Sequence, residues 1–166
     1  NNDAALIGRA VARLSRNPVA ALADFQRAIA LGTKALVAYV AVGLEAMRAG
    51  RYQQASTIID LIRRITVDRR ALALASEWAA IIAAETRQPP DVVRAWFRAA
   101  TELDPGNIHI QRNAEVFEER LRRSNGGPGQ PGRWAIDEPL DLHEERALIS
   151  EMSRAPLAVA SSVRSD

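Results

Sequence analysis

The stretch Gly50-Arg51-Tyr52-Gln53-Gln54-Ala55 decides the fold, because one apolar helical pattern leads into it and another leaves it. Before the stretch, apolar or small residues recur at i, i+3, i+4 and i+7, namely at Tyr39, Val42, Gly43 and Ala46. After the stretch, the same spacing is found at Ala55, Ile58, Ile59 and Ile62. Both patterns predict amphipathic helices. Gly50 permits the left-handed backbone that ends a helix, and Ala55 is small where the two helices cross. The stretch therefore predicts the turn of an antiparallel helix pair.

The same pattern returns with a period of 34 residues, which predicts an array of helical hairpins. The positions of Ala55, Ile59 and Ile62 are matched 34 residues earlier by Ala21, Phe25 and Ala28. The first two units are residues 2–35 and 36–69, and a third unit, 74–107, follows an insertion at 70–73. Residues 108–123 form one more amphipathic pattern. We expect that helix to cap the exposed end of the array.

A change of composition follows the array. Residues 124–133 contain four glycines and two prolines, which predicts a flexible linker. The remaining residues, 134–166, carry more acidic than basic side chains. Asp141 and Glu144 have the spacing of a capping box, so the pattern predicts a short helix over 141–154 that ends before Pro156.

The 34-residue period, Gly43, the stretch at 50–55, Phe25 with Ala28, and residues 100–105 together resemble the tetratricopeptide repeat family over about residues 1–123. The resemblance implies an all-α, right-handed α-solenoid of about three helical hairpins plus a capping helix. It also implies a non-enzymatic scaffold that binds a peptide or helical segment of another protein in a concave groove. Arg9 and Ile81 stand where the family usually has glycine.

The resemblance also implies which residues line the groove, because the first helix of each hairpin faces inward. The corresponding positions are Leu6, Arg13, Val37, Val40, Leu44, Met47, Arg48, Trp78, Ile82, Glu85 and Arg112. Most of them are apolar, and an exposed apolar groove implies a partner segment. We expect Trp78 to be exposed in the middle of the groove and to anchor that partner. The alternative is that some of these side chains are buried between neighbouring helices.

The linker and the acidic tail suggest an occupant for the groove within the chain itself. Residues 1–123 carry 18 basic and 13 acidic side chains, whereas residues 124–166 carry 4 and 7. Tethering raises the local concentration of a segment to about the millimolar range. We therefore expect that residues 134–154 can lie in the groove of their own or a neighbouring molecule.

Residues that could take part in catalysis or metal binding are few. The chain has no cysteine, which excludes disulfides and thiolate zinc sites, and its two histidines, His109 and His143, are far apart. The segment His143-Glu144-Glu145-Arg146 lacks the second histidine of a metalloprotease helix. No lysine followed by Ser or Thr comes after the glycine-rich linker, so it is no phosphate-binding loop. We expect no catalytic residue, metal or cofactor.

Charge and hydropathy bear on partners and location. A formal net charge of +2 and the lack of aromatic residues among the arginines argue against nucleic-acid binding. The pairs Arg63-Arg64 and Arg69-Arg70 either hold an anionic group or interact with a helix C-terminus. No apolar run approaches the roughly 18 residues of a membrane span. A bacterial cytoplasm and a bacterial periplasm are both compatible with the sequence.

Two alternative functions stay open at this point. Residues 151–165 resemble the stretch in which cellulose and exopolysaccharide export proteins pass from periplasmic repeats into an outer-membrane barrel. This resemblance implies a periplasmic part of a bacterial export protein. The other alternative is the regulatory repeat module of a larger enzyme. The chain begins at Asn1 without an initiator methionine, so we expect a processed or cut N-terminus.

Overall fold

The computed structural model describes residues 2–127, 129 and 132–136, and among these residues every regular element is an α-helix. The described helices are α1 (Asn2–Arg13), α2 (Pro18–Ala30), α3 (Leu36–Arg48), α4 (Tyr52–Ile65), α5 (Arg69–Glu85), α6 (Pro90–Leu103) and α7 (Ile108–Ser124). The expected all-α class is therefore confirmed. The predicted helix at 141–154 lies outside the described residues, as does most of the acidic tail.

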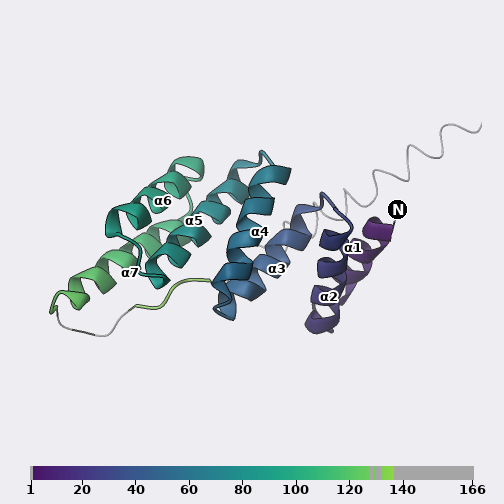
Figure 1. Ribbon diagram of the computed structural model, residues 1–166, viewed down its shortest axis with the longest axis horizontal. Helices are drawn as coiled ribbons and strands as arrows, with labels where there is room; N and C mark the ends of the chain where they lie inside the picture. Colours follow the sequence, from purple (N-terminus) through teal and green to yellow (C-terminus); the bar gives the residue numbers. More distant parts are fainter. Residues whose placement is uncertain (1, 128, 130–131, 137–166) are drawn as a thin grey trace, which may run out of the picture. The chain divides into compact units, whose positions relative to one another are not determined.

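The described chain divides into two compact units, which we describe separately. The first unit holds residues 2–42, and the second holds the described residues from 43 to 136. Helix α3 begins in the first unit and ends in the second. Figure 1 labels the helices of both units.

Polar side chains fix where several helices begin. The Asn17 side chain accepts a hydrogen bond from the Ala20 N–H at 3.1 Å, and Pro18 occupies the first turn of α2. Asp68 accepts from the Ala71 N–H at 2.9 Å at the start of α5. Such caps satisfy N–H groups that have no partner inside the helix. Helix starts are thus encoded locally in the sequence.

The turn that decides the fold has the expected geometry. Gly50 has φ 67°, and the Arg51 N–H bonds to the Ala46 carbonyl at 2.8 Å, which closes the end of α3. Helix α4 begins at Tyr52, two residues after Gly50, and Ala55 is fully buried. The corresponding turn between α5 and α6 uses Arg87, whose φ is 57°.

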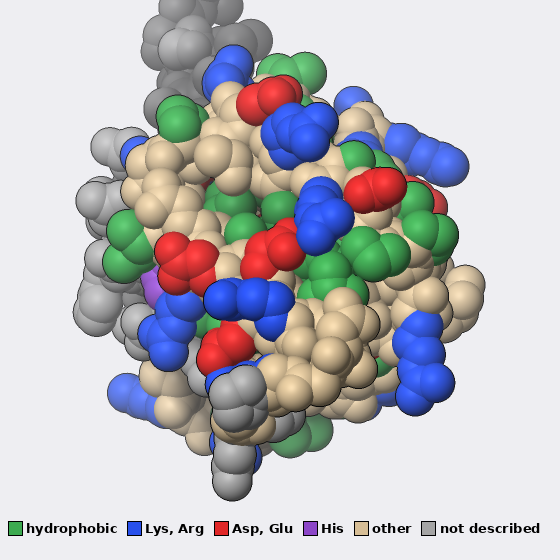
Figure 2. Space-filling model, turned by 90° about the vertical axis from the view of Figure 1, so that its left-hand side faces the viewer, with side chains coloured by type: hydrophobic (Ala, Val, Ile, Leu, Met, Phe, Trp, Pro, Cys, Tyr) green, Lys and Arg blue, Asp and Glu red, His purple; other side chains and the backbone are tan. Residues whose placement is uncertain are grey.

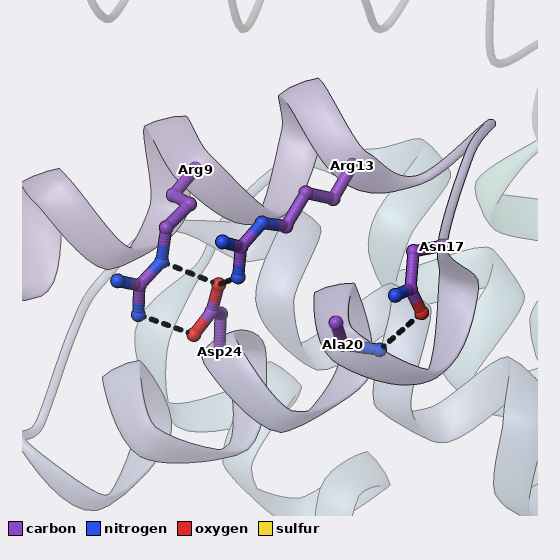
Figure 3. A network of polar contacts seen from close by, with 5 residues as sticks. All are labelled: Arg9, Arg13, Asn17, Ala20 and Asp24. Atoms are coloured by element: carbon purple, nitrogen blue, oxygen red, sulfur yellow. Dashed lines mark hydrogen bonds and ion pairs between the residues drawn. The ribbon is translucent and has the colours of Figure 1, made fainter.

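An ion-pair network joins the helices of the first unit. Helices α1 and α2 pack through Ile7, Ala10, Phe25 and other small or apolar residues. The buried Asp24 carboxylate accepts two hydrogen bonds from Arg9, one of them at 2.7 Å, and a third from Arg13 at 3.1 Å (Figure 3). Arg9 lies on the exposed side of α1 and reaches across to α2. Arg9 thus gives the buried Asp24 carboxylate a charged partner.

Helix α5 is the central element of the second unit, where it packs against α4, α6 and α7. Trp78 is only 1% exposed, so the expectation of an exposed anchor is wrong. A Cβ atom on Gly43 would lie 2.5 Å from the Trp78 ring and 3.0 Å from Ile58. The missing side chain at Gly43 therefore leaves the space that the Trp78 indole fills in the core.

Residues 70–73, expected as an insertion before the third hairpin, belong to α5 and lengthen it to 17 residues. Ala73 packs with Ala100 and Ile110, so the extra turn contributes to the core. The Arg69 guanidinium donates to the Glu102 carbonyl at 2.8 Å and to the Leu103 carbonyl at 3.3 Å. Arg69 thus interacts with the C-terminus of α6, where a cation is favourable.

Candidate functional site

Residues 132–136, which we call the return segment, lie outside any regular secondary structure and against side chains of α5, α6 and α7. The chain turns back after α7 to reach this position (Figure 1). The groove that holds the return segment is defined here by Glu77 and Glu85 of α5, Phe97 of α6, and Asn113 and Arg120 of α7.

Asn113 pairs with both backbone groups of one residue. Its Oδ1 accepts from the Ala135 N–H at 2.7 Å, and its Nδ2 donates to the Ala135 carbonyl at 3.1 Å. The Asn113 side chain has no exposed surface. A carboxamide presents a donor and an acceptor side by side, and here they pair with the carbonyl and the N–H of the same residue. Asn113 therefore holds an extended chain through atoms that are common to nearly all residues.

Glu77 sets the orientation of that carboxamide. Nδ2 of Asn113 also donates to Glu77 Oε1 at 2.7 Å, and Glu77 is 3% exposed. Burial raises the pKa of Glu77 to about 7, while the hydrogen bond from Asn113 acts in the opposite direction. Because Glu77 Oε1 accepts from the Asn113 amino group, that group lies on the side of Glu77. Oδ1 is then left to accept from Ala135.

Trp134 is held on three sides. Its indole Nε1–H donates to Glu85 Oε1, and the Arg120 guanidinium lies over the ring at 4.3 Å from the centroid. The Phe97 ring lies next to the indole, with centroids 6.4 Å apart. A guanidinium over the ring and an aromatic neighbour both stabilise a bound indole. A buried indole N–H also needs a hydrogen-bond acceptor, which Glu85 provides.

Arg120 links the Trp134 contact to the backbone of the return segment. Its Nη1 donates to Glu85 Oε1 at 2.7 Å, and its Nε donates to the Gly132 carbonyl at 2.8 Å. A Cβ atom on Gly132 would lie 3.2 Å from Val116, so the backbone approaches α7 closely at this point. The segment is thus bound at Gly132, Trp134 and Ala135.

The sequence-predicted groove residues have several different environments. Four of them are buried, namely Val37, Val40, Met47 and Trp78. Leu6, Leu44, Ile82 and Glu85 are half-buried, and Arg13, Arg48 and Arg112 are exposed. Arg13 bonds to Asp24 in the first unit. Glu85 is the predicted residue for which the structure gives a direct contact with the return segment.

The most informative residues of the groove were not among those predicted from the sequence. Asn113 lies on the apolar stripe of α7, three residues after Ile110 and three before Val116, which are both buried. Glu77 lies next to Trp78 in an otherwise apolar stretch of α5. A polar residue at a core position of an amphipathic helix is the signal that marks both.

The expected occupancy of the groove by the tail can be followed only in part. Residues 134–136 belong to both the return segment and the predicted segment 134–154, and the rest of that segment lies outside the described residues. Two residues assigned to the linker, Gly132 and Arg133, belong to the return segment. The stretch 151–165, which carries the resemblance to export proteins, also lies outside the described part of the chain.

The arginine pairs and the charged surface take ordinary structural positions. Arg63 stacks on Trp96 at 4.6 Å from the ring centroid. Arg94 donates to both carboxylate oxygens of Glu118, at 2.7 and 3.0 Å, which lowers the pKa of that carboxyl. Figure 2 faces the end of Figure 1 where α6 and α7 lie, and shows basic and acidic side chains interspersed around hydrophobic ones. That face presents no surface of a single charge.

Two further classes of site were sought in the described residues. No group of three or more His, Cys, Asp or Glu side chains there could hold a metal ion. None of the helices described is both long and apolar enough to cross a membrane. Comparison with protein-family models, curated proteins and solved structures found no match.

Proposed function

We propose that this protein is a non-enzymatic scaffold of tetratricopeptide-like helical hairpins that binds an extended peptide segment along α5 and α7. The pairing of Asn113 with both backbone groups of Ala135 carries this proposal. An extended segment lies in the groove, and a buried amide holds its backbone.

The chemistry of the groove supports a peptide ligand. A buried amide that lacks partners costs about 1–3 kcal/mol, so a fold gains nothing from Asn113 by packing alone. Here the Asn113 amino group donates to Glu77 and to the Ala135 carbonyl, and the Asn113 oxygen accepts from the Ala135 N–H. The arrangement matches the general mode in which backbone pairing gives affinity and side-chain contacts give selectivity.

The repeat assignment rests on the spacing of the elements. Helices α1 and α3 begin 34 residues apart, as do α2 and α4. The contact between Arg69 and the Leu103 carbonyl also joins positions 34 apart. Helix α5 begins 33 residues after α3, but it has 17 residues against 13 in α3, so α6 begins 38 residues after α4. A stack of such hairpins presents its first helices on one side, which is consistent with a groove on α5.

The proposal is tested with a labelled peptide of the sequence Gln-Pro-Gly-Arg-Trp-Ala-Ile-Asp-Glu, which is that of residues 130–138. Its binding to the full chain carrying Trp134→Ala is measured by fluorescence anisotropy. We expect saturable binding that is at least about tenfold weaker when Asn113→Ala is added, because both backbone bonds are lost. A peptide with an N-methyl group on the alanine is the matched ligand control.

Two results would contradict the proposal. One is a failure of the peptide to bind the Trp134→Ala chain while circular dichroism shows that its helices are intact. The other is equal binding of the N-methylated peptide, because the groove would then not use the backbone N–H.

A further inference from the structure

We propose that the return segment is a built-in competitor of the partner, and that the partner is an extended segment with a tryptophan which displaces it. The inference rests on the proposed function and adds the ligand class and its regulation. It is carried by the contacts that the chain makes with its own residues 132–136.

The groove selects a tryptophan through three contacts that no other side chain makes together. Glu85 accepts the indole N–H, which a phenylalanine ring cannot offer. Arg120 lies over one part of the ring system, and Phe97 packs beside it. A ligand with phenylalanine would leave the part-buried Glu85 carboxylate with one hydrogen bond fewer.

The backbone contacts add a rule of spacing. Arg120 binds the carbonyl of the residue two places before the tryptophan, and Asn113 binds both groups of the residue directly after it. The residue after the tryptophan must therefore have a free N–H, which excludes proline. The close approach to Val116 favours glycine two places before the tryptophan. A partner segment is expected to follow the pattern glycine, any residue, tryptophan, any residue except proline.

The return segment satisfies this pattern within the same chain. Seven residues separate Ser124, the end of α7, from Gly132. A connection this short gives a local concentration of about 1 mM, so a contact with a dissociation constant of about 100 μM is occupied roughly ten times in eleven. A partner must then exceed this internal competition, which lowers its apparent affinity about tenfold.

The experiment compares the apparent affinity of one labelled peptide, that of residues 130–138, for three full-length chains. These are the native sequence, Trp134→Ala, and the matched control Arg133→Ala, in which an exposed side chain of the same segment is removed. We expect Trp134→Ala to bind the peptide about tenfold more tightly than the native chain. Arg133→Ala is expected to bind like the native chain, and a peptide with phenylalanine for tryptophan about tenfold more weakly.

A second variant serves as a control for indirect effects of Trp134→Ala. Ala135→Pro removes the N–H that Asn113 binds, in a segment outside all described helices. It should raise the peptide affinity in the same way. Equal affinity of the native chain and both variants would overturn the inference, although the proposed function would stand. Equal affinity for the tryptophan and phenylalanine peptides would overturn the ligand class. If the peptide binds none of the chains, the proposed function itself fails.

Discussion

Asn113 and Glu77 are the pair of residues on which the groove depends. Neither makes an ion pair that the structure describes, and both are buried in an apolar surrounding. Apolar periodicity predicted the helices that carry them. It could not predict their roles, because the hydrogen bond between them joins positions 36 residues apart. Their contact depends on how α5 and α7 pack, which the local sequence does not state.

The raised pKa of Glu77 makes stability depend on pH. Its folded-state pKa of about 7 lies above the ordinary value of 4.5, so the native state holds this proton more tightly than the unfolded chain. The contribution to stability is fully present below about pH 4.5 and is lost as pH rises through 7. Each pH unit between the unfolded and folded pKa values corresponds to about 1.4 kcal/mol, so the loss of stability is roughly 3 kcal/mol.

We predict that Glu77→Gln removes this loss, because a neutral amide is less costly to bury and its oxygen can still accept from Asn113. Thermal unfolding of both chains at pH 5 and pH 8 measures the effect. The variant should gain stability relative to the native chain between the two pH values, and a difference that stays constant would contradict the assignment. Comparing the two chains cancels the titration of all other groups.

At the scale of the elements, the approach of α3 to α5 is set by one glycine. The Gly43 position is closer to the Trp78 ring than a Cβ atom allows. Gly8 in α1 offers a matched comparison, because no atom in the described structure lies within 4 Å of its added Cβ. Both residues are inside helices, where alanine is favoured over glycine by about 1 kcal/mol.

We predict opposite effects for the two alanine variants. Gly43→Ala should lower the free energy of unfolding by about 1–3 kcal/mol, because overpacking outweighs the gain in helix propensity. Gly8→Ala should raise it by up to about 1 kcal/mol. Urea unfolding followed by circular dichroism measures both. A stabilising Gly43→Ala would show that Trp78 is not packed against this position.

The elements also show where the sequence was sufficient. The 34-residue period and the turn residues predicted the helix pairs, whereas the cap that Asn17 supplies to α2 came only from the structure. The expectation that Trp78 is exposed was wrong. It was based on the positions of a repeat pattern, which does not show that Gly43 leaves room for the Trp78 ring in the core. Residues 70–73, which we expected as an insertion between repeats, are part of helix α5. The burial of Trp78 depends on packing between helices rather than on local preference.

At the scale of the whole molecule, the described chain combines seven helices with a segment that lies against α5, α6 and α7. The acidic character of the tail suggested that charge would bring tail and body together. The contacts of the return segment instead use its backbone and the Trp134 indole. The prediction that residues 134–154 can lie in the groove stays a prediction, because only residues 134–136 of that segment are described.

The most direct test of the central claim is amide hydrogen exchange at Ala135 in the full chain, followed by NMR. Because Asn113 accepts the Ala135 N–H in the groove, we predict that this amide exchanges at least about tenfold more slowly in the native chain than in Asn113→Ala. Addition of excess peptide of residues 130–138 should accelerate the exchange as it displaces the return segment. If Ala135 exchanges equally fast in the native chain and in Asn113→Ala, the groove does not hold the backbone as described, and the account is contradicted.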